Sequence, residues 1–217
     1  MRRVDYNHDT GKFTSTMRFR TKKYVVLCGL HAMYLPQTRK NLDLKIYMDC
    51  DETLRRFWKI QRDTKKRGYS KEAVIHSIEE RLDDAIKYIY PQREYADLII
   101  KYYDKNLSDC MVDSYVPKLY AHLTLSASVE IEPLVDALEK YGIVIKYEYS
   151  DNLLNQYVTI EPDYDKNIVI PFEVIAERVI PQLDEVTREN LDQLGDLLDG
   201  ILMLFLLMII STKMQGN

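Results

Sequence analysis

A short basic stretch at residues 59–68 carries the side chains best suited to chemistry. Lys59, Arg62 and Asp63 are spaced i, i+3 and i+4, so in a helix they share one face, and Arg67 follows one turn later. Guanidinium groups bind phosphate oxygens through paired hydrogen bonds, and a carboxylate among them can orient the cations or handle a proton. The same spacing also fits an exposed helix face with a weak ion pair. The spacing alone leaves both interpretations open.

Helix-capping signals predict the elements that hold this stretch. Residues 49–53 (DCDET) bring acidic side chains to a helix start, where the helix dipole favours them, and Gly68 can end that helix. The sequence therefore predicts a helix over about 52–67. Ser70 is a suitable N-cap for a second, amphipathic helix, which Pro91 is expected to end.

Four apolar segments predict strands of an α/β fold. Residues 23–30 (KYVVLCGL) predict a buried, central, parallel strand. His31 follows its carboxyl end, where open α/β sheets place their chemistry. The other three strands are expected at 42–48, 95–102 and 119–129.

The C-terminal part of the chain changes character. Residues 143–149 and 157–160 alternate around a connection and predict an antiparallel hairpin. Helices are expected at 131–141, 172–179 and 187–198, the last leading into a final apolar helix. The apolar run at 201–210 falls short of the roughly twenty residues of a spanning helix. We therefore expect a buried final helix and no membrane partner; a tail anchor is the less favoured interpretation.

Composition narrows the class of protein. The net charge is −4, which gives no general attraction to nucleic acid. The three cysteines are odd in number and widely spaced, which disfavours a disulfide framework and favours a reducing compartment. No signal sequence is visible at the N-terminus, so we expect a cytoplasmic protein.

Residues 49–100 resemble the lid region of the phosphoribulokinase/uridine kinase family. They carry K-x-x-R-D-x-x-x-R-G at 59–68, then a predicted helix, then P-x-x-x-Y-A-D at 91–97 before a strand. The resemblance implies an α/β fold: a partial P-loop-kinase-like parallel sheet with flanking helices, an appended β-rich subdomain and a buried C-terminal helix. The expected parts are the rear half of the kinase domain with its lid helices at 1–104, the β-rich subdomain at 105–165, and C-terminal helices that pack back on the core at 166–217.

The resemblance also implies a function. It implies phosphoryl transfer from ATP, with Mg, to a hydroxyl of a small sugar, sugar phosphate or nucleoside. Lys59, Arg62 and Asp63 would be the catalytic residues, and Arg67 a lid arginine on the nucleotide side. The segment 6–11 (YNHDTG) is similar to the family's substrate-side segment. The substrate-binding residues would be Tyr6, His8 and His31.

Two departures from the family pattern stand out. The family has E-G-L-H where this chain has C-G-L-H at 28–31, and a thiol is a poor ligand for magnesium. No G-x-x-x-x-G-K-[S/T] phosphate loop occurs in the sequence. We therefore expect a truncated or incomplete form, with a homo-oligomer or a partner chain covering an open sheet edge. The alternative is a catalytically inactive pseudokinase fragment that binds an anion or a protein.

A metal site is the remaining question at the first histidines. Cys28 and His31 have ligand-like C-x-x-H spacing, and His8 could join them around zinc. Structural zinc sites usually have four ligands in clear pairs. We therefore predict no metal site built by the protein itself.

Overall fold

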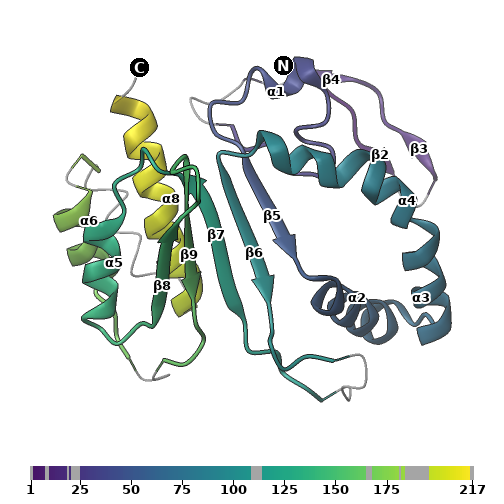
Figure 1. The fold of residues 1–217 in the computed structure, drawn as a ribbon. Helices are drawn as coiled ribbons and strands as arrows, with labels where there is room; N and C mark the ends of the chain where they lie inside the picture. The colour runs from purple at the N-terminus through teal and green to yellow at the C-terminus, as the bar shows by residue number, and fades with distance from the viewer. Residues whose placement is uncertain are drawn as a thin grey trace.

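A five-stranded sheet lies at the centre of the molecule, with strand order β5-β6-β7-β9-β8 (Figure 1). The computed structural model describes residues 2–7, 10–18, 20, 25–108, 114–164, 168–180, 182–183 and 196–215, and for Arg2, Arg3 and Tyr6 the backbone alone. The five strands are β5 (Ile46–Cys50), β6 (Leu98–Tyr103), β7 (Tyr120–Ser126), β8 (Ile145–Tyr149) and β9 (Asn155–Ile160). Two small antiparallel ladders precede the sheet: β1 (Arg2–Arg3) with β4 (Met17–Arg18), and β2 (Tyr6–Asn7) with β3 (Lys12–Phe13).

Strand direction divides the sheet into two parts. β5 and β6 are parallel, whereas β6–β7, β7–β9 and β8–β9 are antiparallel. The hairpin predicted at 143–160 is confirmed as β8 and β9. The strands at 105–165 were expected in an appended subdomain, but they pair directly with β6 and extend the same sheet, because β6 offers its free edge to β7. The three boundaries themselves stay a prediction.

The hydrophobic core covers one face of this sheet. Alternate strand residues such as Leu98, Leu123 and Val158 are fully buried and share one cluster with α5 (Glu132–Glu139), α6 (Phe172–Val179) and α8 (Leu197–Gln215). A Cβ at Gly200 would collide with the Phe172 ring, so α8 needs glycine there to approach α6.

The final helix packs on the core, as predicted. Nine residues of α8 are buried, from Leu198 to Ile209. By length and composition alone α8 could also cross a membrane, but half of its most apolar stretch lies inside the protein. The helix expected at 187–198 falls largely outside the described residues.

Two helices and two tighter turns form the crossover between β5 and β6. α2 (Glu52–Arg67) spans the predicted residues: the Asp51 carboxylate accepts from the Leu54 N–H at 2.7 Å, and Gly68, at φ 73°, ends the helix. α3 (Lys71–Glu80) is capped by Ser70 and followed by α4 (Leu82–Asp84). A π-helical turn (Ala85–Ile89) and a 3₁₀ helix (Tyr90–Tyr95) complete the path. Pro91 does not end the helical path, because it occupies the first turn of the 3₁₀ helix, where its missing N–H costs little.

The strand predicted at 23–30 is wrong over its described residues. Residues 25–28 form no strand, and Val26 is 87% exposed. An apolar run becomes a buried strand only where neighbouring strands receive it. Within the described residues β5 is the edge of the sheet, and nothing there pairs with 25–28. His31 accordingly lies in an exposed turn before α1 (Pro36–Arg39), not at the end of a strand.

Candidate functional site

The predicted chemical residues gather near the C-terminal end of α2. Arg62 Nε lies 2.8 Å from Asp63 Oδ1, and Arg67 Nη1 lies 3.2 Å from the same oxygen. The Asp63 side chain is 7% exposed, whereas the two arginines are 51% and 55% exposed. We call Lys59, Arg62, Asp63 and Arg67 the α2 cluster.

The carboxylate of the cluster is held in its charged form. The hydrogen bond from Arg62 is the main cause that lowers the pKa of Asp63, and the charges of Arg67 and Lys59 add to it. Asp63 is therefore ionised at neutral pH. It is suited to fixing the guanidinium groups rather than to accepting a proton as a base.

Lys59 faces the neighbouring helix. Its Nζ lies 3.5 Å from the Ser77 hydroxyl of α3. Burial lowers the pKa of Lys59, and the positive charge of Arg81 lowers it further. The cluster therefore joins a half-buried ammonium to two exposed guanidinium groups that an anion from solvent can reach.

The three predicted substrate residues are placed differently. His8 and the side chain of Tyr6 lie outside the described residues. His31 is exposed and packs edge-on against Tyr34, with ring centroids 6.0 Å apart. Within the described part of the chain, no hydrogen bond or ion pair joins His31 to the α2 cluster. Their substrate-binding roles remain a prediction.

The segment that carries His31 is fixed by the P-Q-x-x-Y-A-D motif. Gln92 is buried, accepts from the Met33 N–H at 2.9 Å and donates to the Leu30 carbonyl at 2.7 Å. At the other end of the motif, Asp97 accepts from the Lys45 N–H at 2.7 Å and from Lys213 Nζ of α8 at 2.9 Å. These motif residues position the backbone around the site instead of facing a ligand.

The residues weighed for zinc do not form a site in the described structure. Cys28 is exposed, and over the ranges described no group of three His, Cys, Asp or Glu side chains gathers for a metal ion. Burial raises the pKa of Cys50 to about 11, so this second thiol stays protonated at neutral pH.

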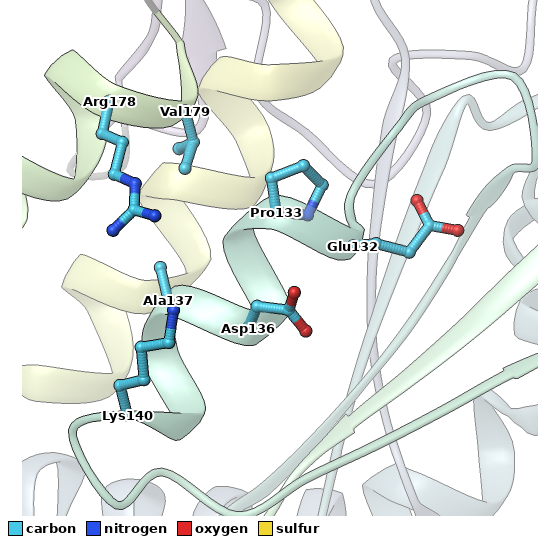
Figure 2. Close-up of a pocket in the computed structure, with 7 residues that line it drawn as sticks. All are labelled: Glu132, Pro133, Asp136, Ala137, Lys140, Arg178 and Val179. Carbon is cyan, nitrogen blue, oxygen red and sulfur yellow. The ribbon is translucent and has the colours of Figure 1, made fainter.

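Two hollows lie away from the α2 cluster. One, the α5–α6 groove of about 230 Å³, is lined by charged and small side chains; Figure 2 shows Arg178 of α6 reaching toward Ala137 of α5. The other holds about 330 Å³ against the sheet and is lined by Asp51, Lys101, Tyr103 and His122. We call it the sheet-face pocket. The sequence analysis did not single out Lys101 or His122; the signal available was a charged or imidazole side chain at alternate positions in otherwise apolar strands.

Comparisons with known proteins agree with this architecture. Residues 1–108 match the model of the Phosphoribulokinase / Uridine kinase family. Phosphoribulokinase from Synechocystis sp. is 40% identical over 96 residues, which cover 44% of this chain and 29% of the relative. The chloroplastic enzyme from Spinacia oleracea is 42% identical over 96 residues and 24% of its length. Uridine kinase from Staphylococcus haemolyticus is 34% identical over 99 residues and 46% of its length.

A solved structure extends the likeness in fold. Phosphoribulokinase from Rhodobacter spheroides matches with a TM-score of 0.56 at 19% identity, over 89% of this chain and 68% of that one. A match of that extent reaches well beyond residue 108, so the antiparallel strands are part of the shared fold. The sequence matches span less than half the length of the relatives. Through residues 1–108, this chain belongs to the phosphoribulokinase/uridine kinase family.

Proposed function

We propose that this chain supplies the lid and acceptor side of an ATP-dependent phosphotransferase that acts on a hydroxyl of a small sugar, sugar phosphate or nucleoside. The observation that carries the proposal is the buried Asp63 carboxylate held between Arg62 and Arg67. It stands in a family segment whose relatives are named phosphoribulokinase and uridine kinase.

The α2 cluster suits this reaction because phosphoryl transfer depends mainly on positioning and charge stabilisation. Arg62 and Lys59 would stabilise the charge that develops on the transferring phosphoryl oxygens. Arg67 would act from the nucleotide side. Asp63 would hold the two guanidinium groups in place, since its lowered pKa keeps it anionic. His31, with Tyr6 and His8, would contact the acceptor.

The described residues fit the phosphates of ATP better than they fit magnesium. Exposed guanidinium groups are phosphate ligands. Magnesium prefers oxygen ligands, but a thiol stands at residue 28 and the described residues offer no cluster of three metal-binding side chains. We therefore assign no step to a metal held by these residues.

The phosphate loop would come from another polypeptide. The outer edge of β5 has no strand partner within the described residues, and the apolar residues 25–28 are exposed beside the same end of the chain. Unpaired strand edges and apolar segments favour association. We propose a partner chain or a second copy at this edge, in the cytoplasm.

Cys28 favours a second candidate function. Without the family's acidic residue, the chain would bind an anionic metabolite or a partner protein without transferring phosphate. Both candidates share the α2 cluster as a binding site. They differ in whether a polypeptide that carries a phosphate loop restores transfer.

Calorimetric titration with Mg-ATP and with a pentose phosphate tests the binding step that both candidates need. We expect at least one to bind, and Arg62→Ala to weaken binding about tenfold because a charge-assisted hydrogen bond is lost. Arg56→Ala is the matched control, since Arg56 lies on the same helix but pairs with Glu52 at 2.8 Å. Absence of binding by both ligands, or equal weakening in the two variants, would contradict the proposal.

A further inference from the structure

A polar row crosses the sheet on the face opposite the hydrophobic core. The strand register aligns Asp49 with Lys101, Lys101 with His122, His122 with Thr159, and Thr159 with Lys146. Side chains alternate between faces along a strand, and the neighbours of these residues, such as Ile100 and Leu123, fill the core. The row is half-buried in its middle, at Lys101 and His122. A sheet face that is merely solvated does not need an imidazole and an ammonium at its centre.

The sheet-face pocket lies over this row. Asp51, Lys101, Tyr103 and His122 line its volume of about 330 Å³, enough for a small phosphorylated molecule. Two aromatic stacks form firm walls: Tyr103 on Tyr120, with centroids 5.1 Å apart, and His122 on Tyr157, with centroids 5.7 Å apart. The polar groups therefore project from a rigid surface.

The cations in the pocket have little internal compensation. Across the ranges that the structure describes, no carboxylate lies within ion-pair distance of the Lys101 ammonium. Asp49, opposite Lys101 in register, accepts instead from the Cys50 N–H at 2.9 Å and lies 3.9 Å from Arg93. Asp51 uses one oxygen to cap α2. Lys101 thus keeps its donors for a ligand.

His122 is oriented toward the same space. Its Nδ1 lies 2.9 Å from the Thr159 hydroxyl, which fixes the ring. In the tautomer in which Thr159 donates to Nδ1, the Nε2–H is left to donate to an anion. The charged groups that act on the ring are Lys101 of β6, Arg93 of the 3₁₀ helix and Glu148 of β8, two cations against one carboxylate.

We propose that the sheet-face pocket binds a small hydroxylated phosphomonoester. Lys101 and His122 hold its phosphate, and the Asp51 carboxylate accepts a hydrogen bond from one of its hydroxyl groups. The carboxylate would repel a bare dianion at that side, so it orients the ligand with its phosphate over β6 and β7. The Tyr103 ring packs against the carbon skeleton.

This site is separate from the α2 cluster. Asp51 caps the start of α2 and Asp63 lies near its end, about 18 Å away along the helix axis at 1.5 Å per residue. The two sites can therefore bind independently. A test in the Arg62→Ala chain removes the contribution of the α2 cluster.

The test follows the imidazole of His122 by NMR in the Arg62→Ala chain, titrated with inorganic phosphate and with a pentose 5-phosphate. His122→Gln assigns the signal among the four histidines. We expect bound phosphate to raise the pKa of His122, because a nearby anion favours the charged ring. We expect the pentose 5-phosphate to bind more tightly than inorganic phosphate.

Matched variants decide whether the pocket is the cause. Lys101→Met should weaken binding about tenfold, and Lys101→Arg should keep it. Lys146→Met, at the far end of the polar row, should leave binding unchanged, since Lys146 already pairs with Glu161. An unchanged His122 pKa with both ligands, or equal binding by the Lys101→Met and Lys146→Met chains, would overturn the proposal. Preserved dispersion of the other signals shows that each variant is folded.

Discussion

The α2 cluster draws its four charged side chains from little more than two turns of one helix, whereas the sheet-face pocket draws its lining from β6, β7 and the start of α2. The helix alone brings Arg67 to Asp63, at i and i+4. Only the β6–β7 register brings Lys101 to His122. Similar charges are thus assembled by local geometry in one region and by long-range pairing in the other.

The two regions also differ in how deeply they are supported. Between Glu52 and Glu80, the buried residues of α2 and α3 are Leu54, Asp63, Val74 and Ile78. The sheet rests on a large cluster that includes α5, α6 and α8. We therefore expect the α2 cluster to depend on helix capping and ion pairs, and the sheet-face pocket to depend on the core beneath it.

The largest expected effect comes from opening a cavity under the sheet-face pocket. Leu123 is fully buried on β7, next to His122, and Leu123→Ala should lower the free energy of unfolding by about 2–5 kcal/mol. Urea denaturation measures this loss. Thr124→Ala, on the opposite face of the same strand, is the control and should cost less than about 1 kcal/mol. Equal losses in the two variants would mean that the core does not support this region as described.

Asp51 joins the two regions, because it caps α2 and lines the sheet-face pocket. Asp51→Ala should cost about 0.5–2 kcal/mol of stability, as the Leu54 N–H loses its acceptor. Asp51→Ser retains a capping oxygen and should restore most of that stability without restoring the carboxylate. Thermal unfolding and pentose phosphate binding separate the two roles. If the serine variant recovered binding together with stability, the carboxylate would have no part in the pocket.

The α2 cluster should show its charge in the acid limb of stability. Since the folded pKa of Asp63 is below its usual range, its contribution is fully present above pH 4 or so and is lost as the pH falls through the folded pKa. Asp63→Asn should therefore flatten the loss of stability on acidification. Urea unfolding at neutral and at acid pH measures the difference. Asp83→Asn, an exposed carboxylate on α4, is the matched control; a similar flattening there would remove the special role of Asp63.

The smallest effect is expected from the imidazole of the sheet-face pocket. Burial, with the charges of Lys101 and Arg93, lowers the pKa of His122 below 6.5. The unfolded chain then binds the proton more readily, so stability falls as the pH drops through 6.5 toward the folded pKa. His122→Gln should reduce this dependence. His76→Gln, exposed on α3 and 3.2 Å from Glu80, is the control, and an equal change in both variants would contradict the burial of His122.

Local patterns predicted the lid region well. The capping signals at Asp51 and Gly68 bound α2 at the residues where the structure begins and ends it. The spacing of Arg62, Asp63 and Arg67 anticipated their ion pairs. The alternation around 150–156 anticipated the hairpin of β8 and β9. Each of these features depends on residues close together in the chain, so the sequence carries the information directly.

The features that needed distant partners were decided by the tertiary structure. The apolar residues 25–28 have the composition of a buried strand, yet they stay exposed because no described strand pairs with them. The strands after residue 104 join the kinase sheet because β6 presents its edge to β7. Lys101 and His122 form one pocket only through that register. The sequence by itself determined the helix that carries the α2 cluster, since i to i+4 geometry is local; the tertiary structure decided which strands are neighbours and hence which side chains meet across the sheet.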